Sequence, residues 1–408
     1  MRILFLHYAF PGPFRYLAES FAALPENVVV FASEYGRRDL LIPGVRRMGL
    51  GTPKMKVVQG PQSPLRDAGR DLQMAYLRGS MTAQALRSLK GAGFIPDMVC
   101  ATAVMGNSLF LRDIFPDSFL VAHAETYAPQ GGGPEGPEGL GGTPQRVRNL
   151  LQVHGLVDCD LAVVPTEWQR KQFPAWLRKN MEVLPQCVDT DFFSPDSAGP
   201  AEAESVTFSA HGLEAPPEWS RLAETIRALL PIRPACRIVV LASGLRRERL
   251  AALREEATQW GGGQVSLHGF SSPDFYRRVL RASSLYVHIA SLPLLPTGLL
   301  ESMSCGCPVL APGTGPVGEV ILDGRNGFAC DFHSPASTAA RIAELLDEGG
   351  LLRKTGEAAR RFVTEGYSLA RTMPENRDRL LQSYQGWLGA RRRHVNHKER
   401  MTLVRREG

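Results

Sequence analysis

The chain has 408 residues, of which 44% are hydrophobic and 22% are charged, and it carries a formal charge of +6. Its length exceeds the roughly 250–300 residues that one hydrophobic core serves, which excludes a single-core protein and predicts two domains. No stretch approaches the ~20 apolar residues of a membrane span, and the composition is that of an ordinary soluble globular protein.

Short apolar segments alternate with helical patterns in the first half of the chain, which is typical of βαβ units and parallel sheets. The first segment lacks a small-residue cleavage site and is too short for a signal peptide, so it is expected to be a buried strand. The expected strands are Ile3–His7, Asn27–Ala32, Met98–Ala101, Phe119–Ala122, Leu161–Pro165 and Met181–Leu184. The expected helices are Phe14–Leu24, Leu65–Gly91 and Arg146–Cys159.

A Gly- and Pro-rich segment, Gln130–Pro144, interrupts this pattern. No packed element is expected there, and two interpretations stay open: a flap over the functional site, or an insertion without a function.

The second half of the chain repeats the alternation after a segment rich in Pro, Gly, Ser and acidic residues, Phe193–Ser205, which predicts a linker. The expected strands are Val206–Ala210, Arg237–Ala242, Gln264–His268, Leu285–Ile289, Val309–Ala311 and Gly327–Cys330. The expected helices are Glu218–Leu230, Leu245–Trp260, Ser272–Ala282, Gly298–Cys305, Ala336–Glu348 and Met373–Arg393. The last of these is expected to return to the first domain.

The predicted organisation is therefore a first doubly wound domain at 1–192, a linker at 193–205, a second doubly wound domain at 206–372, a returning helix at 373–393 and a basic tail at 394–408. Residues 391–408 hold seven Lys or Arg and two Glu, a charge of +5 that accounts for most of the excess. This end could contact anionic lipid at the inner membrane, or it could be a solvated terminus. We expect a cytoplasmic protein.

Seven cysteines are present, and the pair Cys305 and Cys307 has neither zinc-ligand nor redox-motif spacing. Free, mostly buried thiols in a reducing compartment are the expectation. The nine histidines are scattered, so neither a metal nor another cofactor is predicted. Only the basic tail favours nucleic acid, which is not expected as a partner.

The most informative segment runs from Ser291 to Gly327. A strand is expected to end near Ile289, and a helix to open at Gly298 with Thr297 as its N-cap. A helix N-terminus at the carboxyl end of a parallel strand binds anions, so a diphosphate would fit on the amides of Gly298 and Leu299. Glu301 would accept hydrogen bonds from ribose hydroxyls, or it would only complement the helix dipole.

Two motifs in this segment resemble the donor site of GT-B retaining glycosyltransferases of family 4. They are Leu-Glu-Ser-Met-Ser-Cys-Gly-Cys-Pro-Val at 300–309 and Gly-Glu-Val-Ile-Leu-Asp-Gly-Arg-Asn-Gly at 318–327. The resemblance covers about 370 residues, everything but the tail. It implies two Rossmann-like doubly wound α/β domains that face each other across a cleft, with a C-terminal helix that returns to the first.

The resemblance also implies transfer of a hexose, with retention, from a nucleotide-diphosphate sugar to a glycan, lipid or protein acceptor, without a metal. The donor would lie mostly on the second domain and the acceptor on the first. The candidate catalytic residues, which follow the strand Phe119–Ala122, are His123 and Glu125. The candidate donor-binding residues are Thr297, Gly298, Leu299, Glu301, Gly269, Phe270, Glu319, His211, Arg246 and Arg247.

Several positions depart from the family pattern. Pro293 replaces the first Glu of the Glu-x7-Glu pair, and His211 and Pro217 stand where two diphosphate-binding cations are usual. Asn107 stands where an acidic residue is usual. These departures support the alternative of a degenerate binding or partner subunit. Arg15, at the start of the first helix, and the pair Arg246 and Arg247, just after a strand, are the candidate replacements for the missing cations.

Overall fold

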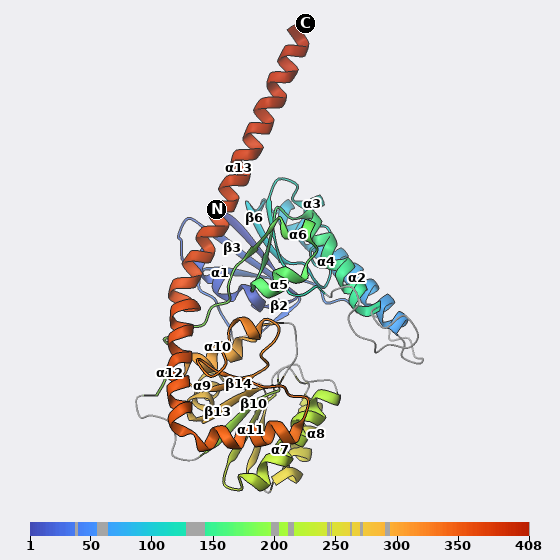
Figure 1. The fold of residues 1–408 in the computed structure, drawn as a ribbon. Helices are drawn as coiled ribbons and strands as arrows, with labels where there is room; N and C mark the ends of the chain where they lie inside the picture. The colour runs from blue at the N-terminus through green and yellow to red at the C-terminus, as the bar shows by residue number, and fades with distance from the viewer. Residues whose placement is uncertain are drawn as a thin grey trace. The chain divides into compact units, whose positions relative to one another are not determined.

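The computed structural model describes residues 1–36, 40–54, 64–127, 143–196, 204–210, 216–242, 245, 247–261, 263–269, 272–289 and 294–407. The chain forms two compact units, one of Met1–Pro185 with Met373–Gly408 and one of Gln186–Thr372. Each unit contains its own parallel β-sheet with helices packed on it (Figure 1). The expected flap and linker fall largely outside the described residues.

The first unit is built on a seven-stranded parallel sheet with the order β5-β3-β1-β6-β7-β8-β9. Its strands are β1 Arg2–Leu6, β3 Val28–Ser33, β5 Val45–Gly49, β6 Met98–Thr102, β7 Phe119–His123, β8 Leu161–Val164 and β9 Met181–Val183. Two short strands, β2 Ala9–Phe10 and β4 Tyr35–Gly36, pair beside it. Because β1 lies between β3 and β6, the strand order reverses there, and such a switch point is where doubly wound sheets bind ligands.

Helices cover both faces of this sheet, which explains why its strands are continuously apolar. Ile3 and Phe5 pack in one buried cluster with α1, whereas Leu4 and Leu6 pack in another with α2. The helices are α1 Arg15–Ala22, α2 Pro64–Gly91, α3 Leu111–Ile114, α4 Thr143–Asp158, α5 Glu167–Gln172 and α6 Ala175–Arg178, after the 3-10 turn Gly12–Phe14. Figure 1 shows α2 and α4 side by side, and the two are in contact.

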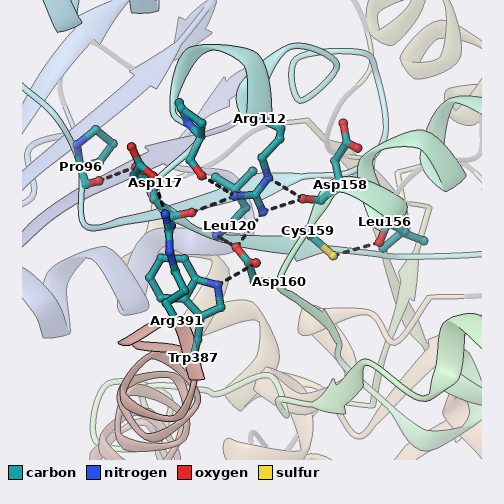
Figure 2. A network of polar contacts seen from close by, with 12 residues as sticks. Pro96, Arg112, Asp117, Leu120, Leu156, Asp158, Cys159, Asp160, Trp387 and Arg391 are labelled. Atoms are coloured by element: carbon teal, nitrogen blue, oxygen red, sulfur yellow. Dashed lines mark hydrogen bonds and ion pairs between the residues drawn. The ribbon is translucent and has the colours of Figure 1, made fainter. Parts of the chain in front are cut away.

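The C-terminal helix α13, Leu369–Glu407, returns to the first unit as expected. The rings of Tyr384 and Trp387 lie 5.8 and 5.5 Å from that of Phe119 at the start of β7. The Trp387 indole donates a hydrogen bond to Asp160 at 2.9 Å, and the same carboxylate accepts one from Arg112 at 2.8 Å (Figure 2). The prediction of a returning helix is confirmed.

The second unit is built on a six-stranded parallel sheet with the order β12-β11-β10-β13-β14-β15. Its strands are β10 Ser205–Ser209, β11 Arg237–Leu241, β12 Val265–His268, β13 Leu285–His288, β14 Val309–Ala311 and β15 Phe328–Ala329. Its helices are α7 Pro216–Ile232, α8 Arg247–Gly261, α9 Pro273–Ala282, α10 Thr297–Ser304, α11 Pro335–Asp347 and α12 Gly349–Gly366, with the 3-10 turn Val317–Glu319. The strand order reverses between β10 and β13, so this unit also has a switch point.

The two faces of the second sheet carry separate apolar clusters. Val206 and Phe208 face α7, α8 and α11, whereas Tyr286 belongs to the cluster formed with α9, α10 and α12. Successive residues of a strand point to opposite faces. Ser209 therefore lies on the same face as Tyr286, toward α10.

Thr297 is not the N-cap of α10, which corrects the expectation from the sequence. The N-cap is Pro296, whose backbone is extended with φ −77° and ψ 130°, and no side chain caps the helix. Thr297 is the first helical residue and is exposed. The ring of Pro296 fixes φ in the range that this cap position needs, so the helix begins without a hydroxyl cap.

All seven cysteines are free, and five of them are buried: Cys100, Cys187, Cys236, Cys305 and Cys307. Burial raises the pKa of each of these thiols, which disfavours the reactive thiolate. Within the described ranges, no helix combines the length and the apolar character needed to cross a bilayer.

Candidate functional site

The first group of candidate residues lies on α10, after the carboxyl end of β13 in the second unit. Leu299 and Leu300 are buried, whereas Thr297 is exposed and Gly298 and Glu301 are half-buried. Residues three and four apart share one face of a helix, so Thr297, Gly298 and Glu301 form its accessible face. This face joins the positive end of the helix dipole to a carboxylate one turn away.

Two tyrosine hydroxyls lie directly against Gly298. A Cβ atom at this position would lie 2.7 Å from Oη of Tyr276 and 3.0 Å from Oη of Tyr286, so only glycine fits without a shift. Both hydroxyls therefore lie at the start of α10. Burial is the main cause that raises the pKa of both tyrosines, with the Glu301 charge adding to it.

Some backbone groups of α10 already form hydrogen bonds within the helix. The Leu299 amide donates to the Pro296 carbonyl at 3.1 Å, and the Glu301 carbonyl accepts from the Cys305 amide at 3.0 Å. A role for the Leu299 amide in anion binding would therefore require it to share its hydrogen. Of the predicted pair of amides, that of Gly298 is the stronger candidate.

Arginines gather at the opposite end of α10. The Arg360 guanidinium donates to the Ser304 carbonyl at 2.8 Å, and the charges of Arg281, Arg360 and Arg277 act on the Cys305 thiol. Cations at a helix C-terminus stabilise the helix through its dipole. Arg360 therefore stabilises the helix end directly, whereas Arg281 donates to Ser194 and Arg277 pairs with Asp274.

The other predicted donor-binding residues follow neighbouring strands of the same sheet. Gly269 directly follows β12, and a Cβ there would lie 2.4 Å from a methyl of Leu250. Arg247 is the exposed first residue of α8, and Glu319 is the exposed last residue of the 3-10 turn after β14. Four positions singled out in the sequence lie outside the described residues: His211, Arg246, Phe270 and Pro293.

The second group lies in the first unit, where three side chains stand at the carboxyl ends of adjacent strands. Thr102 pairs in register with His123, and His7 follows Leu6, which pairs with Ala101 beside Thr102. The Thr102 hydroxyl and His123 Nδ1 are both buried without a hydrogen-bond partner among the described residues. The row His7, Thr102 and His123 therefore offers unused polar atoms at the switch point of this sheet.

Both imidazoles of this row are held neutral. Burial lowers the pKa of His123 to about 4, and the nearby His7 adds to the effect. Burial also lowers the pKa of His7, whose Nδ1 lies 2.6 Å from the Ala9 carbonyl oxygen. Gly12, with φ +50°, packs on the His7 ring, where a Cβ would approach Nδ1 to an impossible distance. The ring of His7 is therefore fixed by its own loop.

Glu125 is half-buried two residues beyond β7, and burial raises the pKa of its carboxyl. Its backbone carbonyl accepts a hydrogen bond from the buried Gln169 side chain at 2.5 Å, which fixes this turn. The Glu125 charge also acts on Tyr8, which links it to the start of the chain. The structure thus brings Glu125 to the same sheet edge as His123.

A buried ion pair that the sequence did not reveal lies at this edge. Arg78 of α2 contacts Glu34 at 2.5 Å, and the Glu34 side chain is only 1% exposed. Asn107 donates to Glu34 and to Thr82, both at 3.1 Å. Glu34 follows β3 and could have been suspected from its place at a strand end, whereas nothing in the pattern of α2 marks Arg78.

In the part of the chain that the structure describes, no three His, Cys, Asp or Glu side chains lie close enough together to bind a metal ion.

Two family profiles match successive parts of the sequence. Residues 25–193 match a profile described as glycosyl transferase family 4 group, and residues 202–362 match one described as glycosyl transferases group 1. The chain is 30% identical over 187 residues to D-inositol 3-phosphate glycosyltransferase of Acidothermus cellulolyticus. This alignment covers 41% of each of the two chains. It is 31% identical over 94 residues to N-acetyl-alpha-D-glucosaminyl L-malate synthase of Bacillus anthracis, which covers 23% of this chain and 25% of the relative.

The chain thus matches only 25% and 41% of the length of these two curated relatives. Two similar solved structures, in contrast, cover nearly the whole of this chain. The sucrose-phosphate synthase of Thermosynechococcus elongatus superposes with a TM-score of 0.72 at 14% identity, over 96% of this chain and 100% of that one. Anabaena HepE in complex with UDP-glucose superposes with a TM-score of 0.68 at 17% identity, over 94% and 100%.

Proposed function

From a chain that belongs to the group 1 glycosyltransferases of the family 4 type and has their GT-B fold, we propose an enzyme that transfers a hexose from a nucleotide-diphosphate sugar to an acceptor hydroxyl. The observation that carries the proposal is the accessible face of α10. There the Gly298 backbone at the helix N-terminus and the Glu301 carboxylate lie one turn apart at the end of a parallel strand.

The proposed donor contacts follow from the chemistry of a nucleoside diphosphate. The diphosphate binds at the start of α10, where the amide hydrogens and the dipole favour an anion. Glu301 accepts hydrogen bonds from the two ribose hydroxyls, and the backbone at Gly269, after β12, lies near the base. Binding of UDP-glucose by the structurally similar Anabaena HepE supports a nucleotide-sugar as the donor class.

The proposed reaction retains the configuration of the transferred sugar. The bond between the anomeric carbon and the phosphate oxygen breaks, the acceptor oxygen bonds to the anomeric carbon on the same face, and the acceptor proton passes to the departing phosphate. Catalysis then rests on positioning and on stabilisation of the charge that develops on the leaving phosphate. Arg247, with Arg246 before it, is the proposed counter-charge, because the arginines described near α10 already have other partners: Arg360 donates to Ser304, Arg281 to Ser194 and Arg277 to Asp274.

His123 and Glu125 are the proposed contributions of the first unit. A neutral imidazole can donate or accept a hydrogen bond to a sugar hydroxyl without repelling a cationic transition state. The lowered pKa of His123 keeps the imidazole neutral at physiological pH. The acceptor, a glycan, a lipid or a protein, is proposed to bind in this unit beside Glu125.

Calorimetry with UDP and GDP tests the proposal on the whole chain. Loss of a charged hydrogen-bond partner costs about 1–3 kcal/mol, so Glu301→Gln should weaken nucleotide binding by roughly 5- to 150-fold. Glu344→Gln removes an exposed charge from α11, whose partner Arg341 lies 3.2 Å away, and should leave the affinity unchanged. If wild-type protein binds neither nucleotide, the alternative of a binding subunit with a degenerate donor site replaces the proposal.

The basic end of the chain is proposed to hold the enzyme at an anionic membrane surface, on the evidence of the +5 charge of residues 391–408. Each Lys or Arg near such a surface contributes about 1 kcal/mol, and salt screens the attraction. Deletion of residues 391–408 should abolish sedimentation with phosphatidylserine vesicles, and salt should mimic the deletion for the intact chain. Equal binding of the two proteins would mark this end as a solvated terminus.

A further inference from the structure

The loop between β6 and α3 lies directly against α2 in the first unit. A Cβ on Gly106 of this loop would lie 2.3 Å from the Ala75 carbonyl oxygen. A Cβ on Gly79 of α2 would likewise lie 2.8 Å from the Gly106 carbonyl oxygen. The Arg78 guanidinium donates to the Met105 carbonyl at 3.3 Å. Close backbone contacts and this hydrogen bond therefore fix the loop on the helix.

Met105, in this loop, has the left-handed backbone conformation that favours glycine. Its φ is +73°, and among the described residues it is the only non-glycine residue with a positive φ. The conformation is unfavourable for a residue with a Cβ atom, and strain of this kind gathers at functional sites. The side chain is 45% exposed, so it contributes little to the core. Glycine would form the same turn with less strain, which leaves the side chain itself to be explained.

Two exposed apolar side chains of α2 stand beside this loop. Leu72 and Tyr76 are 37% and 60% exposed, and they lie four residues apart on one face of the helix. That face continues to Gly79, which touches the loop, and the Tyr76 ring lies 6.4 Å from the ring of Phe110 at the end of the loop. We call Leu72, Tyr76 and Met105 the apolar stripe. It borders the switch point of the first sheet, where β6 lies beside β1.

The polar side chains that fix the loop are engaged with one another. Asn107 donates to Glu34 and to Thr82, both at 3.1 Å, and Arg78 contacts Glu34 at 2.5 Å. These groups are not available to the hydroxyls of a sugar ring, whereas a hydrocarbon chain needs only apolar surface. Three side chains also fall far short of the roughly 20–30 residues that each partner contributes to a stable protein interface. The stripe therefore suits a hydrocarbon chain better than a sugar or a protein surface.

We propose that the apolar stripe binds the hydrocarbon chain of a lipid acceptor, and that Met105 is a contact that selects it. The inference rests on the proposed function and selects one of its three acceptor classes. Because β6 pairs with β7, the stripe lies at the same sheet edge as His123 and Glu125, beside which the head group of the acceptor would bind. Residues 391–408, with their charge of +5, belong to the same unit and favour an anionic lipid surface as its surroundings.

Alkyl glucosides of different chain length test the inference on the whole chain. Calorimetry compares the affinities for methyl β-D-glucoside and octyl β-D-glucoside, the latter below its micelle concentration. Each methylene removed from water strengthens binding by about fourfold, so octyl glucoside should bind about 30-fold more tightly if two to three methylenes reach the stripe. Met105→Gly and Tyr76→Ala should each lower this ratio of affinities by about 5- to 15-fold, because each removes apolar contact with the chain.

Thermal unfolding separates a contact with the ligand from a structural role. Glycine adopts the backbone conformation of Met105 freely, so Met105→Gly should unfold at the same temperature as wild type or a higher one. Ile95→Ala is the matched control, since Ile95 is an exposed apolar residue before β6, at the opposite edge of the same sheet, and the ratio should not change. A marked fall in Tm for Met105→Gly, with the full ratio kept in Tyr76→Ala, would make Met105 structural and overturn the inference.

The remaining outcomes distinguish this inference from the proposed function. Equal affinities of wild type for the two glucosides would overturn the inference, and so would an unchanged ratio in both variants. UDP and GDP affinities of wild type are measured separately, so either result leaves the proposed donor site intact. A chain-length preference that both variants lose, in a protein that binds neither nucleotide, would support lipid binding by the stripe and refute the donor role of α10.

Discussion

Gly298→Ala sets two effects of opposite sign against each other at the start of α10. Alanine is the better helix former by about 1 kcal/mol in a helix interior, and the backbone of Gly298 needs no positive φ. On propensity alone, the substitution should stabilise the protein. The added methyl group, however, would lie 2.7 Å from the Tyr276 hydroxyl and 3.0 Å from that of Tyr286.

The steric effect should win. Gly298 is the second residue of the helix, so the gain from propensity is smaller than in an interior. Both contacts are to the far ends of side chains, but Tyr286 is only 2% exposed and Tyr276 packs in the same cluster, so neither ring swings away freely. Overpacking of this kind costs about 1–3 kcal/mol. We expect a net loss of about 1–2 kcal/mol.

Thermal unfolding with and without UDP measures both consequences. For a unit of this size, 1–2 kcal/mol corresponds to a fall in Tm of about 2–8 °C. Nucleotide affinity should fall with it, and Tyr276→Phe should restore part of the stability of Gly298→Ala, because it removes the closer contact. Gly366→Ala is the control, since a Cβ at this last residue of α12 meets no atom within 4 Å. An unchanged or higher Tm for Gly298→Ala, with full nucleotide affinity, would refute the steric argument.

Two further predictions concern the first unit. The folded-state pKa of His123 is lowered to about 4, so the unfolded chain takes up a proton below pH ~6.5 that the folded chain does not. Stability should therefore fall as the pH drops from about 6.5 to 4, and urea midpoints of His123→Asn should fall less over that range; parallel curves would contradict the assignment. Trp387→Phe removes the donor that lies 2.9 Å from Asp160 and should cost about 0.5–1.5 kcal/mol, whereas Tyr384→Phe, which keeps its ring on Phe119, should cost less. Equal urea midpoints for Trp387→Phe and wild type would show that the indole hydrogen bond does not anchor α13.

The buried parts of the two sheets could be predicted from the sequence because both of their faces are covered. Such strands are short apolar runs, and the predicted runs coincide with the central strands to within one or two residues. The edge strand β5 escaped prediction because its sequence, Val-Arg-Arg-Met-Gly, has two exposed arginines and no apolar run. The helix α12 also escaped, because glycines stand at both of its ends and at Gly356, where α12 approaches the Gly306 carbonyl too closely for any Cβ.

The α10 part of the candidate site was predicted for a different reason. Its motif is local, since one helix start and one carboxylate four residues later fall within a single stretch of chain. The groups that surround the helix start are not local: the hydroxyls at Gly298 come from Tyr276 on α9 and Tyr286 on β13. A tyrosine in an amphipathic helix is ordinarily a core residue, so no pattern distinguishes one whose hydroxyl lies at a site.

A departure from the family pattern must also be judged from neighbours that are distant in the sequence. Asn107 replaces a usual acidic residue, which by itself suggests a damaged site. In the structure its side-chain amide donates to the buried carboxylate of Glu34, which already shares the single guanidinium of Arg78. An acid at position 107 would place a second carboxylate beside the buried carboxylate of Glu34, and the repulsion between the two would cost several kcal/mol. Asn107 is thus part of a hydrogen-bonded network in this chain and does not by itself mark a damaged site. The departures at the donor site require the same test against their own neighbours.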